Sequence, residues 1–158
     1  MTLAPLPKVG GSGPLTARIA IVTDAATADD IWKGYPLAGA MGDFFSKLLH
    51  EAGILRSEVF VIPVLQHRVS EPNLLYTETK SKAQKLGLGA VIGETWVHAS
   101  IPPAIASLHE TLSSLPSLLI TVALGDLAML ALTGQYGSVD TWRGSIMEAS
   151  HNSAFSVI

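Results

Sequence analysis

Short apolar runs that alternate with helix-like segments constrain the fold of this chain more than any other feature. The apolar runs lie at residues 18–23, 59–64 and 118–124, and helical patterns lie at residues 41–52, 103–115 and 126–132. An alternation of strands and helices predicts a parallel sheet, because the crossover between two parallel strands is long enough to hold a helix. We therefore predict an α/β fold, a three-layer α/β/α domain with a central, mainly parallel sheet.

The clearest helical pattern is at residues 41–52. Its apolar side chains recur every three or four positions and are Met41, Phe44, Phe45, Leu48, Leu49 and Ala52. A single stripe of this kind is typical of a helix that packs on a core. Asp43 suits the positive end of the helix dipole, and Gly53 is placed to end the helix.

The chain divides into two unequal parts. Residues 1–16 are rich in Gly and Pro and are predicted to be a flexible N-terminal lead-in, followed by one domain over residues 17–158. A glycine pair at residues 11–13 hints at a phosphate loop, but no strand precedes it.

Between residues 66 and 93 the pattern weakens, and Arg68, Lys80, Lys82 and Lys85 make the stretch basic. It is either a solvated loop and helix or a patch that faces a DNA backbone.

Composition narrows the classes of function. The formal net charge of -3 counts against strong non-specific binding of nucleic acid by this chain alone. Cysteine is absent, which excludes disulfides, cysteine zinc sites and iron–sulfur clusters, and the five histidines show no metal-ligand spacing. No metal and no cofactor are expected.

The apolar region at residues 115–132 is broken by Gly125 and Asp126, so a strand and a helix explain it better than a membrane span. With no signal peptide either, a cytoplasmic protein is expected.

The fold predicts where a site should lie. In open parallel sheets, ligands bind outside the carboxyl ends of the strands. Asp24, residues 63–68 and the pair Gly125 and Asp126 each follow or end a predicted strand. We therefore expect these residues to meet at one crevice.

Several motifs point to a family. Residues 23–27 read Thr-Asp-Ala-Ala-Thr, residues 34–42 read Gly-Tyr-Pro-Leu-Ala-Gly-Ala-Met-Gly, and residues 51–59 read Glu-Ala-Gly-Ile-Leu-Arg-Ser-Glu-Val. In order and spacing they resemble motifs of the uracil-DNA glycosylase superfamily, which implies a uracil-DNA glycosylase-like fold. The subgroup that this chain most resembles is the cysteine-free bacteriophage type, often associated with a family A DNA polymerase. The iron–sulfur subgroup carries Cys where this chain has His67.

The resemblance implies roles for individual residues. Excision of uracil needs a flipped base, a ring to stack on it, an amide to read its edge and a carboxylate to position water. Asp24 stands at the family's acidic position, and Ala25 beside it would line the base pocket. Leu37 stands where relatives have the stacking Phe, and Pro63 where they have the base-reading Asn. The stacking and reading contacts are therefore expected to be lost.

Contacts to DNA or phosphate are implied at other positions. Arg68 and Asn73 follow the second strand as an Arg and an Asn do in relatives, and Arg143 lies in a turn resembling the family's Arg-Gly turn. Gly39 and Gly42 precede or open a helix and would bind phosphate through backbone N–H groups. The alternative for these glycines is a tight strand-to-helix turn.

The family's last motif, His-Pro and a small residue, is expected just past Ile158, so the C-terminal part of the domain is expected to be missing. A complementing C-terminal chain or an oligomer would then cover an open sheet edge.

Three hypotheses follow. The chain is a degenerate relative that binds DNA, including single-stranded DNA, or a replication partner such as a DNA polymerase; in a phage-infected cell it would act in the host cytoplasm. Alternatively, it is an active uracil-DNA glycosylase that hydrolyses the N-glycosidic bond. A third hypothesis is an α/β module that binds a small phosphorylated ligand at Gly39 and Gly42.

Overall fold

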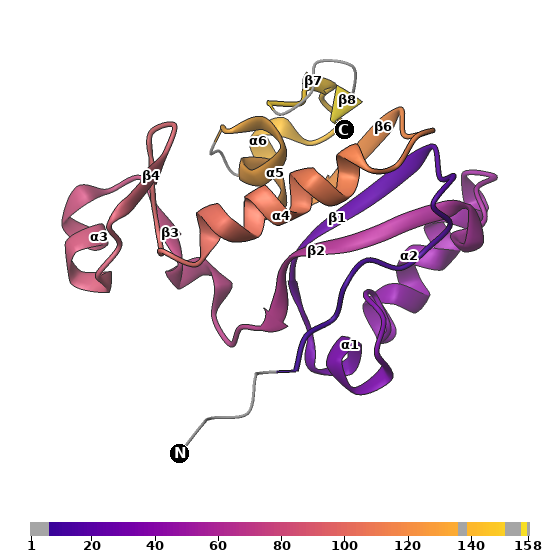
Figure 1. Cartoon of the computed structure of the whole chain (residues 1–158), viewed down its shortest axis with the longest axis horizontal. Coiled ribbons are helices and arrows are strands. Elements are labelled where there is room, and N and C mark those ends of the chain that lie inside the picture. Colours follow the sequence, from indigo (N-terminus) through magenta and orange to yellow (C-terminus); the bar gives the residue numbers. More distant parts are fainter. Residues whose placement is uncertain (1–6, 136–138, 151–155, 158) are drawn as a thin grey trace.

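The computed structural model describes residues 7–135, 139–150 and 156–157. Within these ranges, a five-stranded sheet has the order β2-β1-β6-β8-β7 (Figure 1). Its strands are β1 (Ile19–Ala26), β2 (Val59–Arg68), β6 (Ile120–Leu124), β7 (Met147–Glu148) and β8 (Ser156–Val157). Neighbouring strands are parallel from β2 to β8, and β7 runs antiparallel to β8. The predicted central, mainly parallel sheet is therefore confirmed.

Helices cover both faces of this sheet, as predicted. One face carries α4 (Ile101–Ser113) and α5 (Asp126–Thr133), which join the larger hydrophobic core; α4 runs across the front of Figure 1. The other face carries α2 (Ala40–Glu51), whose Leu49 belongs to a smaller core. No helix in the described part of the chain has the length and hydropathy needed to cross a bilayer.

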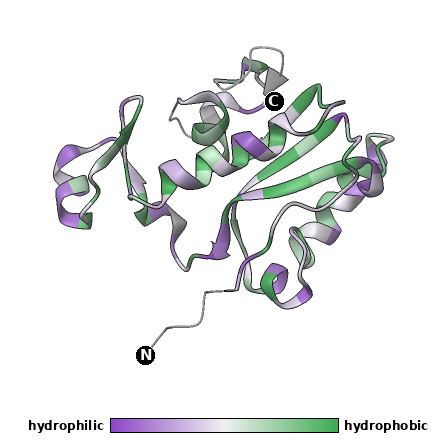
Figure 2. Cartoon of the chain, viewed as in Figure 1, coloured by the Kyte–Doolittle hydropathy of each residue, from purple (hydrophilic) through white to green (hydrophobic). Residues whose placement is uncertain are grey.

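The central strands are apolar on both faces because both faces are packed (Figure 2). On β1, Ala20 and Val22 belong to the larger core, whereas Ile21 belongs to the smaller one. On β2, Ile62 and Val61 divide in the same way. Successive side chains of a strand point to opposite faces, so up to the irregularity near Ala25, even-numbered residues of β1 and β2 meet α4 and α5 and odd-numbered ones meet α2.

Elements extend beyond the predicted limits at the carboxyl ends of the strands. β1 continues to Ala26, and a further helix, α1 (Ala28–Lys33), lies between the first predicted strand and the first predicted helix. The Thr27 hydroxyl accepts a hydrogen bond from the Asp30 amide at 3.2 Å, and the Asp30 carboxylate accepts one from the Thr27 amide at 2.9 Å. This reciprocal capping box explains why so short a helix begins there.

The weakly patterned region forms a small second sheet of order β3-β5-β4. It consists of β3 (Tyr76–Thr77), β4 (Ala90–Ile92) and β5 (Thr95–Val97), with α3 (Lys80–Leu86) beside it. In Figure 1 this unit projects from the end of α4, away from the central sheet. The remaining short helices are η1 (Arg56–Glu58), η2 (Pro72–Leu74) and α6 (Val139–Trp142).

Residues 8–13 pack along the outer edge of β2, which differs from the predicted flexible lead-in over residues 1–16. The Val9 amide donates to the Gln66 carbonyl at 2.8 Å, and Ser12 exchanges two backbone hydrogen bonds of 2.8 Å with Val61. Val9 is buried, and any side chain at Gly11 would collide with the Phe60 ring. The glycines therefore permit close approach to β2, and the segment shields an edge that would otherwise be open.

Candidate functional site

Asp24 lies at the carboxyl end of β1, and its side chain points at the first turn of α5. Its Oδ1 accepts a hydrogen bond of 2.8 Å from the Ala128 amide. The N-cap residue of α5 is Gly125, which has no side chain to offer. A Cβ atom on Gly125 would collide with the Asp24 carboxylate. Asp24 therefore caps α5 from a neighbouring strand, satisfying an amide that the helix leaves without a partner.

The environment of Asp24 changes its acidity. Burial raises the pKa of its carboxyl to about 6, and the nearby Asp126 carboxylate adds to that rise, while the backbone N–H groups of Ala128 and Leu127 oppose it. The carboxyl is consequently ionised at neutral pH but takes up a proton in mildly acidic solution. Carboxyl groups with this behaviour are common at functional sites.

A cavity of about 330 Å³ opens beside Asp24 at the ends of β1 and β2. We call it the Asp24 cavity, and it is lined by Asp24, Ala25, Ala26, Thr27, Ala28, Arg68, Val69 and Ser70. The β1–β2 register shifts between Ala25 and Ala26, so that Ala26 pairs with Arg68. This irregularity brings Asp24, Ala25 and Arg68 to one cavity, at the edge of the sheet where the crevice was expected.

A second cavity of about 420 Å³ shares Arg68 with the first. Lys8 and His67 line it as well, together with Ser100 at the start of α4. We call it the Lys8 cavity. Lys8 belongs to the predicted lead-in, and sequence reasoning gave it no role; only the apolar Val9 within the Gly- and Pro-rich stretch signalled that this segment packs. Arg68 thus lines both the Asp24 cavity, which holds a carboxylate, and the Lys8 cavity, which holds a lysine.

Leu37 and Pro63 do not line the Asp24 cavity. Leu37 packs in the smaller core below α2, with a left-handed backbone of φ 54°. Pro63 is buried in β2 and pairs with Thr23 of β1. Since alternate residues of a strand face opposite sides, Pro63 and Thr23 share the α2 face, whereas Asp24 points to α5. The sheet therefore separates these two positions from the carboxylate.

Gly39 is the N-cap of α2 and Gly42 lies in its first turn, and both are closely packed. A Cβ atom at Gly42 would collide with the Leu37 carbonyl, and one at Gly39 would collide with the Asp29 carboxylate. The glycines are thus required by contact with other parts of the chain. A carboxylate beside Gly39 also repels a phosphate, so the structure favours the tight-turn interpretation over phosphate binding.

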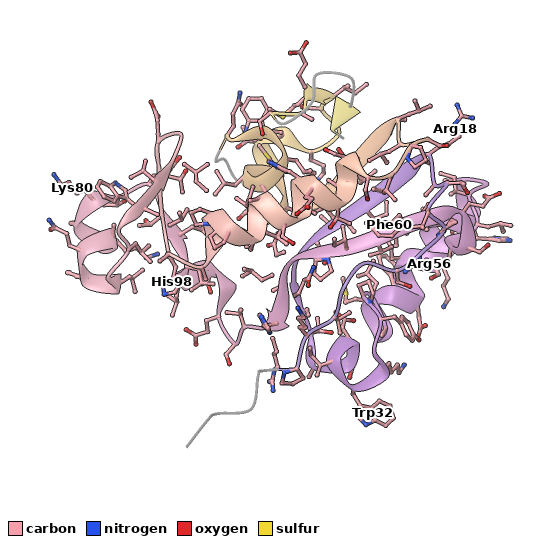
Figure 3. The ribbon with its side chains drawn as sticks, in the orientation of Figure 1. Arg18, Trp32, Arg56, Phe60, Lys80 and His98 are labelled. Atoms are coloured by element: carbon pink, nitrogen blue, oxygen red, sulfur yellow. The ribbon has the colours of Figure 1, made fainter. Side chains whose placement is uncertain are left out.

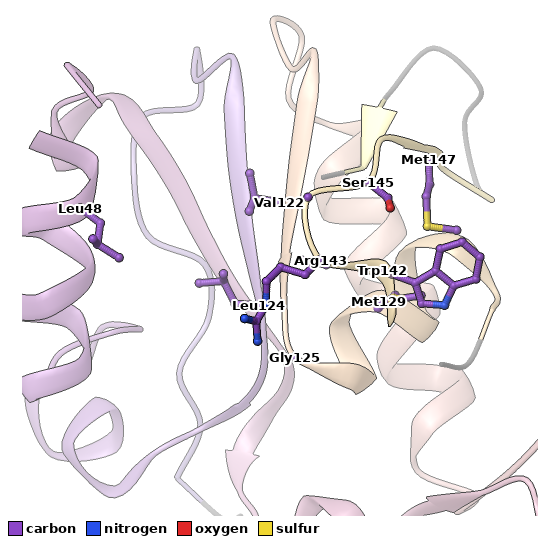
Figure 4. A pocket seen from close by; sticks show the side chains of 11 residues that line it. Leu48, Val122, Leu124, Gly125, Met129, Trp142, Arg143, Ser145 and Met147 are labelled. Carbon is purple, nitrogen blue, oxygen red and sulfur yellow. The ribbon is translucent and has the colours of Figure 1, made fainter. Parts of the chain in front are cut away.

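The other predicted contact residues lie apart from Asp24. Asn73 is exposed in η2 and does not line the Asp24 cavity. Arg143 lines a separate cavity of about 490 Å³ over β6, which we call the Arg143 groove. Figure 4 shows Leu48 of α2 on one side of the groove and Arg143, Trp142 and Met147 on the other, with Val122 and Leu124 between them. Arg68 therefore lines the Asp24 and Lys8 cavities, whereas Arg143 lines the separate Arg143 groove.

Trp32 is the most exposed of the large apolar side chains described for this chain, at 83%. It projects from α1 (Figure 3), one helical turn after Ala28, which lines the Asp24 cavity. Residues four positions apart lie on the same side of a helix. Trp32 is thus an exposed ring on the helix whose first residue lines the cavity.

When the sequence is compared with models of known protein families, it matches one family. The model of the uracil DNA glycosylase superfamily matches residues 11–157. No curated protein matches the chain. The match begins within the segment that packs along β2, in agreement with the structure.

Proposed function

This chain belongs to the uracil-DNA glycosylase superfamily, and we propose on that premise that it binds DNA at the Asp24 cavity without excising the base. Single-stranded DNA is the proposed ligand, since a base must leave the duplex to enter so small a hollow. The resemblance to the phage subgroup supports a role beside a DNA polymerase during replication or repair.

One observation carries the proposal. Asp24, the acidic position of the family motif, faces α5, whereas Leu37 and Pro63 are packed on the opposite side of the sheet. Excision needs the carboxylate, the stacking group and the reading group around the same base. A leucine and a proline behind the sheet supply neither stacking nor an amide, so the cavity retains shape and charge but lacks base recognition.

The surroundings of the cavity suit a nucleic-acid strand. Arg68 lines both hollows and Lys8 lines the second, so positive charge continues from one to the other. Exposed Trp32 offers a face on which a base can stack. With a net charge of -3, we expect binding to be weak and to fall steeply as salt rises.

The pKa of Asp24 favours a second candidate, an active glycosylase. A carboxyl group that titrates near pH 6 is ionised at neutral pH and can hold a water molecule for attack. Its hydrogen bond to Ala128 fixes its orientation. This candidate requires that cleavage occurs without the stacking and reading contacts.

The test measures both activities with the same protein. Binding of a fluorescent single-stranded oligonucleotide is followed by anisotropy for wild type, Arg68→Ala and Arg18→Ala. Arg18 is an exposed arginine at the amino end of the sheet, so it controls for loss of one positive charge (Figure 3). We expect Arg68→Ala to weaken binding about tenfold and to lower the slope of log K against log salt by about 1.

The outcomes separate the candidates. Equal affinities for the two arginine variants would show that the strand does not bind at the Asp24 cavity. Alkali-sensitive sites in a uracil oligonucleotide that disappear with Asp24→Ala would establish excision and overturn the proposal of binding alone. Binding without such sites supports the proposal.

A further inference from the structure

α2 differs from the other described helices in the apolar side chains that it exposes. Met41, Phe44 and Leu48 are all exposed, whereas each other described helix exposes at most one large apolar side chain. Because they are spaced three and four residues apart, these side chains lie on one side of α2, and we call them the outer stripe. Single exposed apolar residues are ordinary, but a contiguous group is typical of an interaction surface.

Two exposed side chains of opposite charge accompany the outer stripe. They are Asp43, in the first turn of α2, and Lys47, one helical turn later. Lys47 follows Phe44 by three residues and Asp43 by four, so both charges lie along the same flank of the stripe. Read along α2, this flank therefore carries a negative group and then a positive group.

This order of side chains is complementary to itself when it is reversed. We consider two copies of α2 that lie antiparallel about a two-fold axis level with Phe44. Met41 then lies opposite Leu48 of the partner subunit, and the two Phe44 rings meet near the axis. Since the axis brings the same flank of both helices together, Asp43 lies within one residue, about 1.5 Å, of the level of the partner's Lys47. The symmetry repeats this contact, which gives two pairs of opposite charges.

The Arg143 groove continues the outer stripe. Leu48 belongs to both, and Val122 and Trp142 line the groove beyond it (Figure 4). In the antiparallel pair, Met41 of the partner subunit lies against Leu48 and therefore beside this groove. A methionine side chain is unbranched and flexible, so it fits irregular apolar hollows well. The groove, with a volume of about 490 Å³, thus extends the apolar surface that a second copy can cover.

We propose that the outer stripe is an interface between two copies of this chain, paired antiparallel through α2. The apolar side chains supply the affinity. The charge pairs select the orientation, because exposed ion pairs add little energy but like charges disfavour other pairings.

The size of α2 limits the strength of this dimer. The helix has 12 residues and is about 18 Å long, so it buries less than the roughly 800 Å² per partner of a standard interface. We therefore expect a dissociation constant on the order of 10⁻⁵–10⁻⁴ M. The outer stripe is consequently open in dilute solution and covered in concentrated solution.

Sedimentation equilibrium between about 5 and 500 µM protein tests this proposal, and it needs no DNA, so it is independent of the proposed function. We expect the wild type to show a monomer–dimer equilibrium in this range. Leu48→Ala should raise the dissociation constant about tenfold, because the symmetry removes two apolar contacts at once. Leu74→Ala, at an exposed leucine of η2 beside the small sheet, is the matched control and should dimerise as the wild type does.

Exchange of the two charges tests the antiparallel pairing itself. Asp43→Lys and Lys47→Asp should each raise the dissociation constant about tenfold, because each variant sets like charges together twice across the axis. An equimolar mixture of the two variants should dimerise as strongly as the wild type, since one chain then carries only positive groups at these positions and the other only negative ones. High salt should weaken this mixed dimer.

Each result has a definite meaning, because all the substituted side chains are exposed and the variants should retain the circular dichroism spectrum of the wild type. A wild type that stays monomeric over the whole range would overturn the proposal. A dimer that Leu48→Ala leaves intact would also overturn it and place the interface on another surface, such as a sheet edge. A mixture of the charge variants that dimerises no better than either variant alone would overturn the antiparallel pairing.

Discussion

The two faces of the central sheet differ in how completely they are covered. On the α4 and α5 face, large side chains of both helices are almost fully buried: Ile101, Leu108, Leu112, Leu127, Leu130 and Leu132. On the α2 face, Leu49 is buried, but Met41, Phe44 and Leu48 of the same helix are exposed at 71%, 57% and 44%. The predicted apolar stripe of α2 therefore only partly meets the sheet, and Leu48, in its exposed part, lines the Arg143 groove.

This difference also separates the residues of the candidate site. The closed face holds Asp24, which is fixed by a helix amide. The open face holds Leu37 and, by strand alternation, Pro63. The carboxylate thus stays in a packed environment where its charge is unfavourable, while Leu37, one of the positions that the family resemblance assigns to the base, belongs to the packing under α2.

The largest effect is expected from shortening a side chain on the closed face. Leu108→Ala on α4 should lower the free energy of unfolding by about 2–5 kcal/mol, because it removes buried contacts and leaves a cavity. Leu48→Ala, the matched leucine on the open face, should cost less than about 1 kcal/mol. Urea unfolding monitored by circular dichroism measures both. Equal losses would mean that Leu48 is covered in solution and that the faces do not differ.

A smaller effect is expected in the first turn of α2. Gly42→Ala should lower stability by about 1–3 kcal/mol, because the new methyl collides with the Leu37 carbonyl. An alanine inside a helix otherwise stabilises by about 1 kcal/mol relative to glycine, so the sign of the change decides between the two effects. Thermal unfolding measures that sign, with Gly10→Ala, where space is open, as the control. A stabilised Gly42→Ala variant would contradict close packing on this face.

The smallest effect concerns the charge of Asp24 and depends on pH. Burial raises its folded pKa from 3.8 to about 6, so the folded state binds a proton more tightly than the unfolded state does. The carboxyl group therefore costs stability progressively as pH rises from about 4 to 6, and the cost is constant above that range. Asp24→Asn retains an oxygen for the Ala128 amide and should stabilise the protein at pH 7 by about 1–2 kcal/mol.

Below pH 4 this gain from Asp24→Asn should disappear, because both proteins then carry a neutral group. Chemical unfolding at a series of pH values between 3.5 and 7.5 checks this expectation. A difference between the two proteins that does not change with pH would mean that the carboxylate is not desolvated. Loss of stability at neutral pH would show that the ionised cap contributes more than burial costs.

Local patterns predicted most of the regular structure. The apolar runs became β1, β2 and β6, and the periodic segments became α2, α4 and α5. The capping box of α1 was visible in Thr27 and Asp30 but was not read as a helix, since it spans one short turn. The small sheet was missed because strands of two or three residues have no detectable alternation.

The sequence by itself determined the order of strands and helices and that Asp24 and Arg68 would meet at one edge, because periodicity and the direction of parallel strands are local properties. Only the tertiary structure decided that residues 8–13 pack on β2, that Asp24 caps α5, and that Pro63 faces the other way. These outcomes depend on contacts between residues far apart in the chain, and on the parity with which each strand presents its side chains to the two layers.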